Sequence, residues 1–164
     1  MLHPLATQLL IASAMVAANI IIHLVGLGLL LALMRRHGGH LVTKQAAIQQ
    51  AFILMGVAFG LFALHTIEIW GYAILFHAIG ATQSFEAALY YSTATYATIG
   101  YGDVVLDHNW RILGAIEGGN GVILLGWSTA FFVSVVARMR TLEHDWMGGE
   151  AIVHPTPSAP ARDA

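Results

Sequence analysis

Three long apolar stretches limit what this chain can fold into. They run from about Leu5 to Met34, from about Ala51 to Phe76 and from about Ile112 to Val136. Each is long enough to cross a bilayer as a helix, which takes about 20 residues. The chain is 57% apolar and has only seven Lys+Arg and nine Asp+Glu in 164 residues, too little charge to cover a soluble domain of this size. The sequence therefore predicts an all-α integral membrane protein with three spanning helices embedded in lipid.

Composition also excludes several classes of function. The formal net charge is −2, which provides no basic surface for nucleic acid. The absence of cysteine excludes disulfides, thiolate metal sites and cysteine nucleophiles. We expect no nucleic-acid partner, no small-molecule substrate and no cofactor.

The basic residues predict the orientation in the membrane, because cytoplasmic loops carry an excess of Lys and Arg. Most of them lie between the first and second stretches, or at and beyond the end of the third: Arg35, Arg36, Lys44, Arg138, Arg140 and Arg162. Arg111 alone falls on the other side. The N-terminus is therefore expected outside and the C-terminus in the cytoplasm.

A short helix is predicted between the second and third stretches, at residues 84–97. Ser84 provides an N-cap, and Glu86 places an acid in the first turn. About 13 helical residues rise only about 20 Å, so this helix cannot cross the bilayer and has to enter and return on one side. The segment TIGYGD, residues 98–103, follows it directly.

The glycines of TIGYGD suit an ion pathway. Non-helical backbone at membrane depth is tolerated only where protein buries it or where it lines a water-filled path. Gly100 and Gly102 accept left-handed backbone angles, and alternating them with Ile99 and Tyr101 turns successive carbonyls to one side. Such a row of oxygens replaces the hydration shell of a cation, and the Thr98 hydroxyl adds a ligand. One strand supplies one wall, so several chains have to surround the axis.

TIGYGD resembles the filter of prokaryotic-type potassium channels with a single pore loop. The order of outer helix, re-entrant helix, filter and inner helix resembles that family's pore, over about Ala51 to Arg140, and the first helix is an addition. The resemblance implies a four-fold homotetramer in a bacterial inner membrane that conducts K⁺ passively, with K⁺ at the filter as its metal ion. A weakly selective cation channel and an accessory, non-conducting subunit are the alternatives, and the gating stimulus stays open.

The resemblance also assigns roles to single residues. It implies that the ion ligands are the carbonyls of Thr98, Ile99, Gly100 and Tyr101. It implies that the filter is supported by Gly102, Asp103, Tyr90 and Tyr91, with a hydroxyl of one tyrosine bonded to Asp103. Ala97 departs from the many family members that carry a second threonine before the filter, and Ala94 departs from those that carry a carboxylate in the pore helix. These departures put filter inactivation and stability in low potassium in doubt.

The inner helix contains the sequence GVILLG. Gly121 and Gly126 are spaced like the flexible glycines of bacterial potassium-channel inner helices, and Gly121 resembles a gating hinge. Glycine also serves close helix packing in membranes, so hinge and packing both remain open. Leu125 and Thr129 are expected to line the pore.

Three ionisable residues lie at membrane depth: His65, Glu68 and Glu117. Helical rise places all three in the outer half of the membrane, level with the filter. Glu117 is expected behind the filter, bonded to a pore-helix hydroxyl such as Ser92 or Thr95, with His65 as a further partner. Either protonation of this buried support makes conduction pH-dependent, or the residues bond one another and join the helices.

Asn19 and His23 share one face of the first helix. Their height matches that of His65, so we expect them to meet it across the hairpin as packing residues.

Two enzyme interpretations fail on the sequence. Ser128 in GWSTA, residues 126–130, has a Gly-x-Ser setting, but within a continuous helix and without an obvious paired histidine. HGGH, residues 37–40, lies on the opposite side of the membrane from His65 and Glu68, so these groups cannot share a metal ion. We therefore expect a protein that is not an enzyme.

The sequence predicts four parts in order along the chain. Residues 1–36 form the additional helix, 37–47 a cytoplasmic loop, 48–141 the pore domain and 142–164 a disordered cytoplasmic tail. Within the pore domain we expect the pore helix at 84–97, the filter at 98–103 and the inner helix at 110–141.

Overall fold

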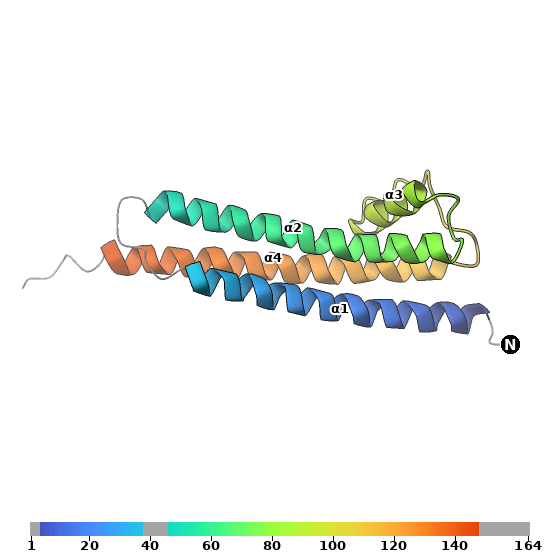
Figure 1. Ribbon diagram of the computed structural model, residues 1–164, viewed down its shortest axis with the longest axis horizontal. Coiled ribbons are helices and arrows are strands. Elements are labelled where there is room, and N and C mark those ends of the chain that lie inside the picture. The colour runs from blue at the N-terminus through green and yellow to red at the C-terminus, as the bar shows by residue number, and fades with distance from the viewer. Residues whose placement is uncertain (1–3, 38–45, 148–164) are drawn as a thin grey trace, which may run out of the picture.

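Three long helices run side by side, and a short fourth helix lies at one end of the bundle (Figure 1). A computed structural model describes residues 4–37 and 46–147 of the chain. The long helices are α1 (Pro4–His37), α2 (Ala46–Ala78) and α4 (Arg111–Met147), and the short one is α3 (Phe85–Tyr96). The predicted fold class, all-α with three membrane-spanning helices, is confirmed.

The apolar sequence explains the three long helices. Stretches long and apolar enough to cross a membrane occupy Leu5–Arg36, Ile48–Ala78 and Arg111–Met139. In a bilayer each backbone amide has to be bonded within its own segment, which a continuous helix achieves. Large apolar side chains such as Phe59 and Phe62 of α2 point outward, where lipid would cover them. The protein is therefore an integral membrane protein.

Helix α3 begins and ends at local signals. Ser84 has an extended backbone and accepts a hydrogen bond from the Ala87 amide at 3.1 Å, and Ala97 follows the last residue as C-cap. Its 12 residues rise about 18 Å, less than the hydrocarbon core. It packs against both α2 and α4. The short helix was predicted at this place.

The far end of α4 differs from the expectation. The inner helix was predicted to end at 141, but it continues to Met147. The six extra residues, LEHDWM, contain neither glycine nor proline, and Gly148 and Gly149 follow them. The predicted tail therefore begins too early at 142, and its remainder, together with most of the predicted loop at 37–47, lies outside the described residues.

Packing holds the bundle in two places. At the α3 end, Tyr72 and Phe76 of α2 meet Leu113 of α4, all fully buried. At the other end Val57 and Leu61 of α2 pack against Val135 of α4, with partly buried residues of α1 around them. Since lipid is as apolar as these side chains, close packing and buried hydrogen bonds hold the helices together more than the hydrophobic effect does.

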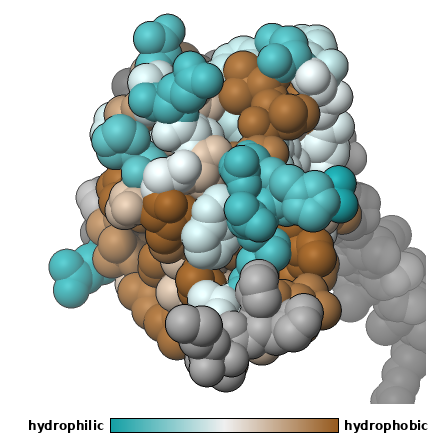
Figure 2. Space-filling view, turned by 90° about the vertical axis from the view of Figure 1, so that its right-hand side faces the viewer, coloured by the Kyte–Doolittle hydropathy of each residue, from teal (hydrophilic) through white to brown (hydrophobic). Residues whose placement is uncertain are grey.

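The end of the bundle that carries α3 has a polar surface. Figure 2 looks onto this end and shows hydrophilic residues gathered between apolar ones. Exposed polar residues of the connecting loops include Gln83, Asp103, Asp107, His108 and Asn109. This polar rim fits a surface that meets water, while the sides of the bundle fit lipid.

Candidate functional site

In the backbone that follows α3, every second residue has a positive φ angle. Residues Thr98, Gly100 and Gly102 have φ values of 61°, 57° and 77°, while Ile99 and Tyr101 between them do not have positive φ. Thr98 is the unusual member, because a side chain with positive φ is strained. This alternation turns successive carbonyls to the same side of residues 98–102, a non-helical segment that we call the strand. Every second residue of 98–102 thus has the angle needed for a row of oxygens.

The strand is anchored where it leaves α3. The amides of Ile99 and Gly100 both donate to the Ala94 carbonyl, at 2.8 and 3.1 Å, and the Thr98 amide donates to Thr95 at 3.0 Å. These bonds take up carbonyls that the end of a helix otherwise leaves free. The start of the strand is therefore fixed relative to the helix that precedes it.

The two large side chains of the strand are not buried by other residues of the same chain. Ile99 is 51% exposed and Tyr101 is 73% exposed. Large apolar side chains exposed together at a polar end commonly mark a protein–protein contact.

A hydrogen bond ties the end of the strand to α3. The Tyr90 hydroxyl donates to Asp103 Oδ2 at 2.8 Å. Bonding to the carboxylate raises the pKa of Tyr90 above its ordinary value. The structure thus contains the predicted bond, through the first tyrosine of the pair. Tyr91 packs edge-on against Phe76, with ring centroids 5.5 Å apart.

Glu117 of α4 lies behind α3. It is fully buried and accepts a hydrogen bond from the Ser92 hydroxyl, which also contacts the Ile69 carbonyl at 3.0 Å. Its other carboxyl oxygen has no partner among the described residues. Of the two hydroxyls expected, Ser92 is the one bonded, and His65 bonds elsewhere.

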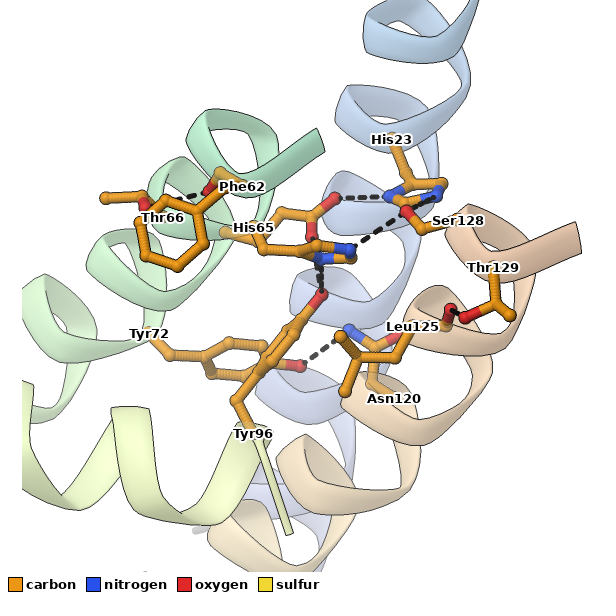
Figure 3. A network of polar contacts seen from close by, with 11 residues as sticks. His23, Phe62, His65, Thr66, Tyr72, Tyr96, Asn120, Leu125, Ser128 and Thr129 are labelled. Atoms are coloured by element: carbon orange, nitrogen blue, oxygen red, sulfur yellow. Dashed lines mark hydrogen bonds and ion pairs between the residues drawn. The ribbon is translucent and has the colours of Figure 1, made fainter. Parts of the chain in front are cut away.

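A second group of polar residues joins all four helices next to the C-terminal end of α3 (Figure 3). His23 Nδ1 and His65 Nδ1 contact the two carboxyl oxygens of Glu68, each at 2.9 Å. His65 Nε2 lies 2.9 Å from Ser128 Oγ, and His23 Nε2 lies 3.5 Å from the same oxygen. The Tyr96 hydroxyl donates to Glu68. We call these five residues the His–Glu cluster.

The three ionisable residues predicted as one support therefore separate into two groups. His65 and Glu68 belong to the His–Glu cluster, whereas Glu117 belongs to the pair with Ser92. Sequence reasoning gave His23 only a packing role and did not bring in Tyr96. Buried Asn19 is not bonded to His65, and its amide nitrogen has no partner among the described residues.

The expectation that Ser128 has no paired histidine is wrong, because its hydroxyl lies 2.9 Å from His65 Nε2. Ser128 Oγ, His65 and Glu68 form a hydroxyl–imidazole–carboxylate chain. The hydroxyl is buried inside α4, whose amides are engaged in helical bonds. A nucleophile also needs free donors for an oxyanion and access for a substrate, and a helix interior provides neither.

The glycines of the inner helix differ in their surroundings. A Cβ atom at Gly121 would collide with the Tyr96 backbone, so here α4 and the end of α3 approach closely. A Cβ atom at Gly126 would meet nothing within 4 Å. Gly121 thus has a packing role, and a hinge role stays a prediction. Leu125 is half-buried and Thr129 is exposed, and its hydroxyl donates to the Leu125 carbonyl.

Comparison with known proteins gives one match. A family model described as an ion channel matches residues 52–138, more than half of the chain. No curated protein and no solved structure matches. The matched range comprises most of α2, all of α3 and the strand, and most of α4, whereas α1 lies outside it. The chain therefore belongs to this ion channel family, the pore family of two-transmembrane-helix potassium channels.

Proposed function

We propose that this protein is a potassium-selective channel that conducts K⁺ passively through a homotetrameric pore. The observation that carries the proposal is the alternation of positive φ at Thr98, Gly100 and Gly102, directly after a capped helix too short to cross the membrane. Family membership supports ion conduction in general. The finer assignment, potassium at a carbonyl filter, rests on this strand.

In the proposed mechanism the strand replaces water around the ion. The carbonyls of Thr98, Ile99, Gly100 and Tyr101, with the Thr98 hydroxyl, would take the place of the hydration shell of K⁺. The C-terminal end of α3 carries the negative end of the helix dipole, which favours a cation on its approach. Transport then needs no covalent step, because the electrochemical gradient drives it.

Four copies of the chain would enclose the axis. One strand forms one wall, and the exposed side chains of Ile99 and Tyr101 are suited to contact with neighbouring subunits. Homo-oligomers with closed rotational symmetry are the common solution to such an arrangement. Leu125 and Thr129 of α4 are proposed to line the pore below the filter.

Two hydrogen bonds would hold the filter from behind and from outside. Ser92 donates to Glu117 behind the strand, and Tyr90 donates to Asp103 at its outer end. Whether protonation of Glu117 also alters conduction is tested by Glu117→Gln: a current that keeps its pH dependence in this variant excludes that role.

The proposed orientation puts the α3 end outside the cell, with the N-terminus outside and the C-terminus in the cytoplasm, as in a bacterial inner membrane. Arg35 and Arg36 at the end of α1 and Arg138 near the end of α4 lie at the opposite end from α3 (Figure 1). The positive-inside bias favours this arrangement.

Reversal potentials test the function. The purified protein is placed in planar bilayers with K⁺ on one side and Na⁺ on the other. A reversal potential close to the potassium equilibrium value is expected. A reversal near zero with robust current would show a weakly selective cation channel instead. Absence of current across pH and voltage would favour a non-conducting or accessory subunit.

A further inference from the structure

The His–Glu cluster lies outside the proposed filter, and one of its members comes from α1, which the ion channel family model does not include. We propose that His23, His65 and Glu68 form an intramembrane site for a divalent metal ion of the zinc class, which fastens α1 to the pore unit. The site is independent of which ion the filter selects. HGGH, which the sequence analysis considered as a metal-binding segment, takes no part in it.

The ligand atoms are close to the geometry that zinc requires. One ligand atom from each of the three residues lies within 4.8 Å of the other two. Zinc binds nitrogen and oxygen at about 2.0–2.2 Å, so ligand atoms at the corners of a tetrahedron lie about 3.4 Å apart. Each Nδ1 now lies 2.9 Å from a Glu68 oxygen. Opening these contacts by about 0.5 Å would admit the ion between groups that already converge.

The outer contacts orient the three ligands. A metal-bound histidine usually donates its second ring N–H to an oxygen, which fixes the tautomer and the ring. Ser128 Oγ is placed for this, 2.9 Å from His65 Nε2 and 3.5 Å from His23 Nε2 (Figure 3). The Tyr96 hydroxyl donates to Glu68 and steadies the carboxylate. The cluster thus has ligands and the groups that position them.

Charge also favours a cation here. Glu68 is fully buried, and within the described residues its ion-pair contacts are with His23 and His65 alone. A buried carboxylate needs a positive partner, and a bound divalent cation would provide one. The negative end of α3, of which Tyr96 is the last residue, lies beside the cluster and offsets the remaining positive charge.

The ligand set points to zinc rather than to calcium or magnesium. Two imidazole nitrogens and one carboxylate oxygen are ligands that zinc prefers, whereas calcium and magnesium require oxygen ligands. Three protein ligands leave a fourth position for water or the Tyr96 hydroxyl. His65 is the least enclosed of the three, with a side chain 12% exposed in the single chain, and so provides the entry side.

Cobalt binding tests the site without reference to conduction. The full chain, purified without a histidine tag and stripped with a chelator, is titrated with Co²⁺, a spectroscopic substitute for Zn²⁺. We expect the visible bands of four-coordinate Co²⁺, saturating at micromolar concentration with one ion per chain and displaced by Zn²⁺. Zn²⁺ should also raise the unfolding temperature by several degrees, because a ligand of the folded state stabilises it.

Variants separate this site from other histidines. His23→Ala and Glu68→Gln should weaken Co²⁺ binding more than about 100-fold and remove the Zn²⁺ shift. His77→Ala, at an exposed histidine of α2, and the double variant His37→Ala/His40→Ala should keep both. Elution volume and unfolding temperature in chelator report whether each variant is folded.

The Co²⁺ titration of the unsubstituted protein tests the metal site even if a variant does not fold. Absence of a saturable Co²⁺ spectrum in that protein overturns the proposal, as does a spectrum that folded His23→Ala retains. In either case the cluster is a hydrogen-bonded network that joins the helices without a metal ion.

Discussion

Gly121 of α4 lies directly against the backbone of Tyr96, the last residue of α3. A methyl group at this position would collide with the Tyr96 carbonyl, and backbone cannot move aside as a flexible side chain can. We predict that Gly121→Ala destabilises the protein by about 1–3 kcal/mol and displaces the strand that follows α3. Thermal unfolding in detergent and reversal potentials measure the two effects.

The matched control for this prediction is Gly126→Ala. A Cβ atom there meets nothing within 4 Å in the chain, so we expect no loss of stability, and the higher helix propensity of alanine should add up to about 1 kcal/mol. Equal effects of the two substitutions would point to lost helix flexibility, the hinge interpretation, instead of the contact with Tyr96.

The hydroxyl of Ser92 should stabilise the pair behind the filter. Ser92→Ala leaves the buried Glu117 carboxyl without the partner that it has now. We expect a loss of about 1–3 kcal/mol in the free energy of unfolding, the usual penalty of a buried polar group left unbonded. Ser134→Ala is the control, because Ser134 is exposed and bonds its own helix at Ala130. Indistinguishable unfolding of the two variants contradicts the prediction.

The bond between Tyr90 and Asp103 should depend on pH in one direction. Because the hydroxyl donates to the carboxylate, the pKa of Tyr90 lies above its ordinary value of 10.0. The contribution of the bond is therefore fully present below pH about 10 and is lost as the pH rises through the raised value. Tyr90→Phe should shorten the life of the conducting state severalfold at neutral pH. This deficit should fade in alkali.

A double-mutant cycle tests whether Tyr90 affects the open lifetime through its bond with Asp103. If Tyr90 acts through Asp103, adding Tyr90→Phe to Asp103→Asn should change the open lifetime less than Tyr90→Phe does alone. Full additivity of the two substitutions would assign the effect of Tyr90 to another contact.

Gly100 should not tolerate a side chain. Its φ of 57° is left-handed, and a residue with a Cβ costs about 1–2 kcal/mol there, in every chain of the proposed tetramer. We predict that Gly100→Ala lowers the potassium current at least about tenfold or removes its selectivity. Gly28→Ala, in α1 with open space around the added atom, should leave both unchanged. A current of normal size and normal selectivity in Gly100→Ala contradicts the carbonyl filter.

Local signals made α3 and the strand predictable. Ser84 fixes the start of the helix through a bond within four residues, and the glycines at 100 and 102 mark the left-handed positions. The left-handed angle at Thr98 had no such signal, because threonine ordinarily avoids it. It follows from the bonds that the end of α3 makes with the strand.

The His–Glu cluster was beyond sequence reasoning for a geometric reason. Helical rise predicts the height of a residue in the membrane but not the direction in which its helix faces a neighbour. Glu68 and Glu117 were placed at one height, yet they face different partners. The contacts of His23 span 45 and 105 residues of sequence, so no local pattern reports them.

That separation has a consequence for how the protein is made. His23 is synthesised 45 residues before Glu68 and 105 residues before Ser128. At about 5–20 residues per second, the ribosome reaches Ser128 roughly 5 to 20 seconds after His23. Until Glu68 is made, roughly 2 to 9 seconds after His23, the imidazole lies in the bilayer without this partner, held there by the apolar residues of α1. It lacks Ser128 until α4 is made. Helix α1 thus gains its last polar contact only when α4 is made. A chain cut short before α4 would leave His23 Nε2 without Ser128, and we expect proteases to clear such an unfinished chain faster than the full one.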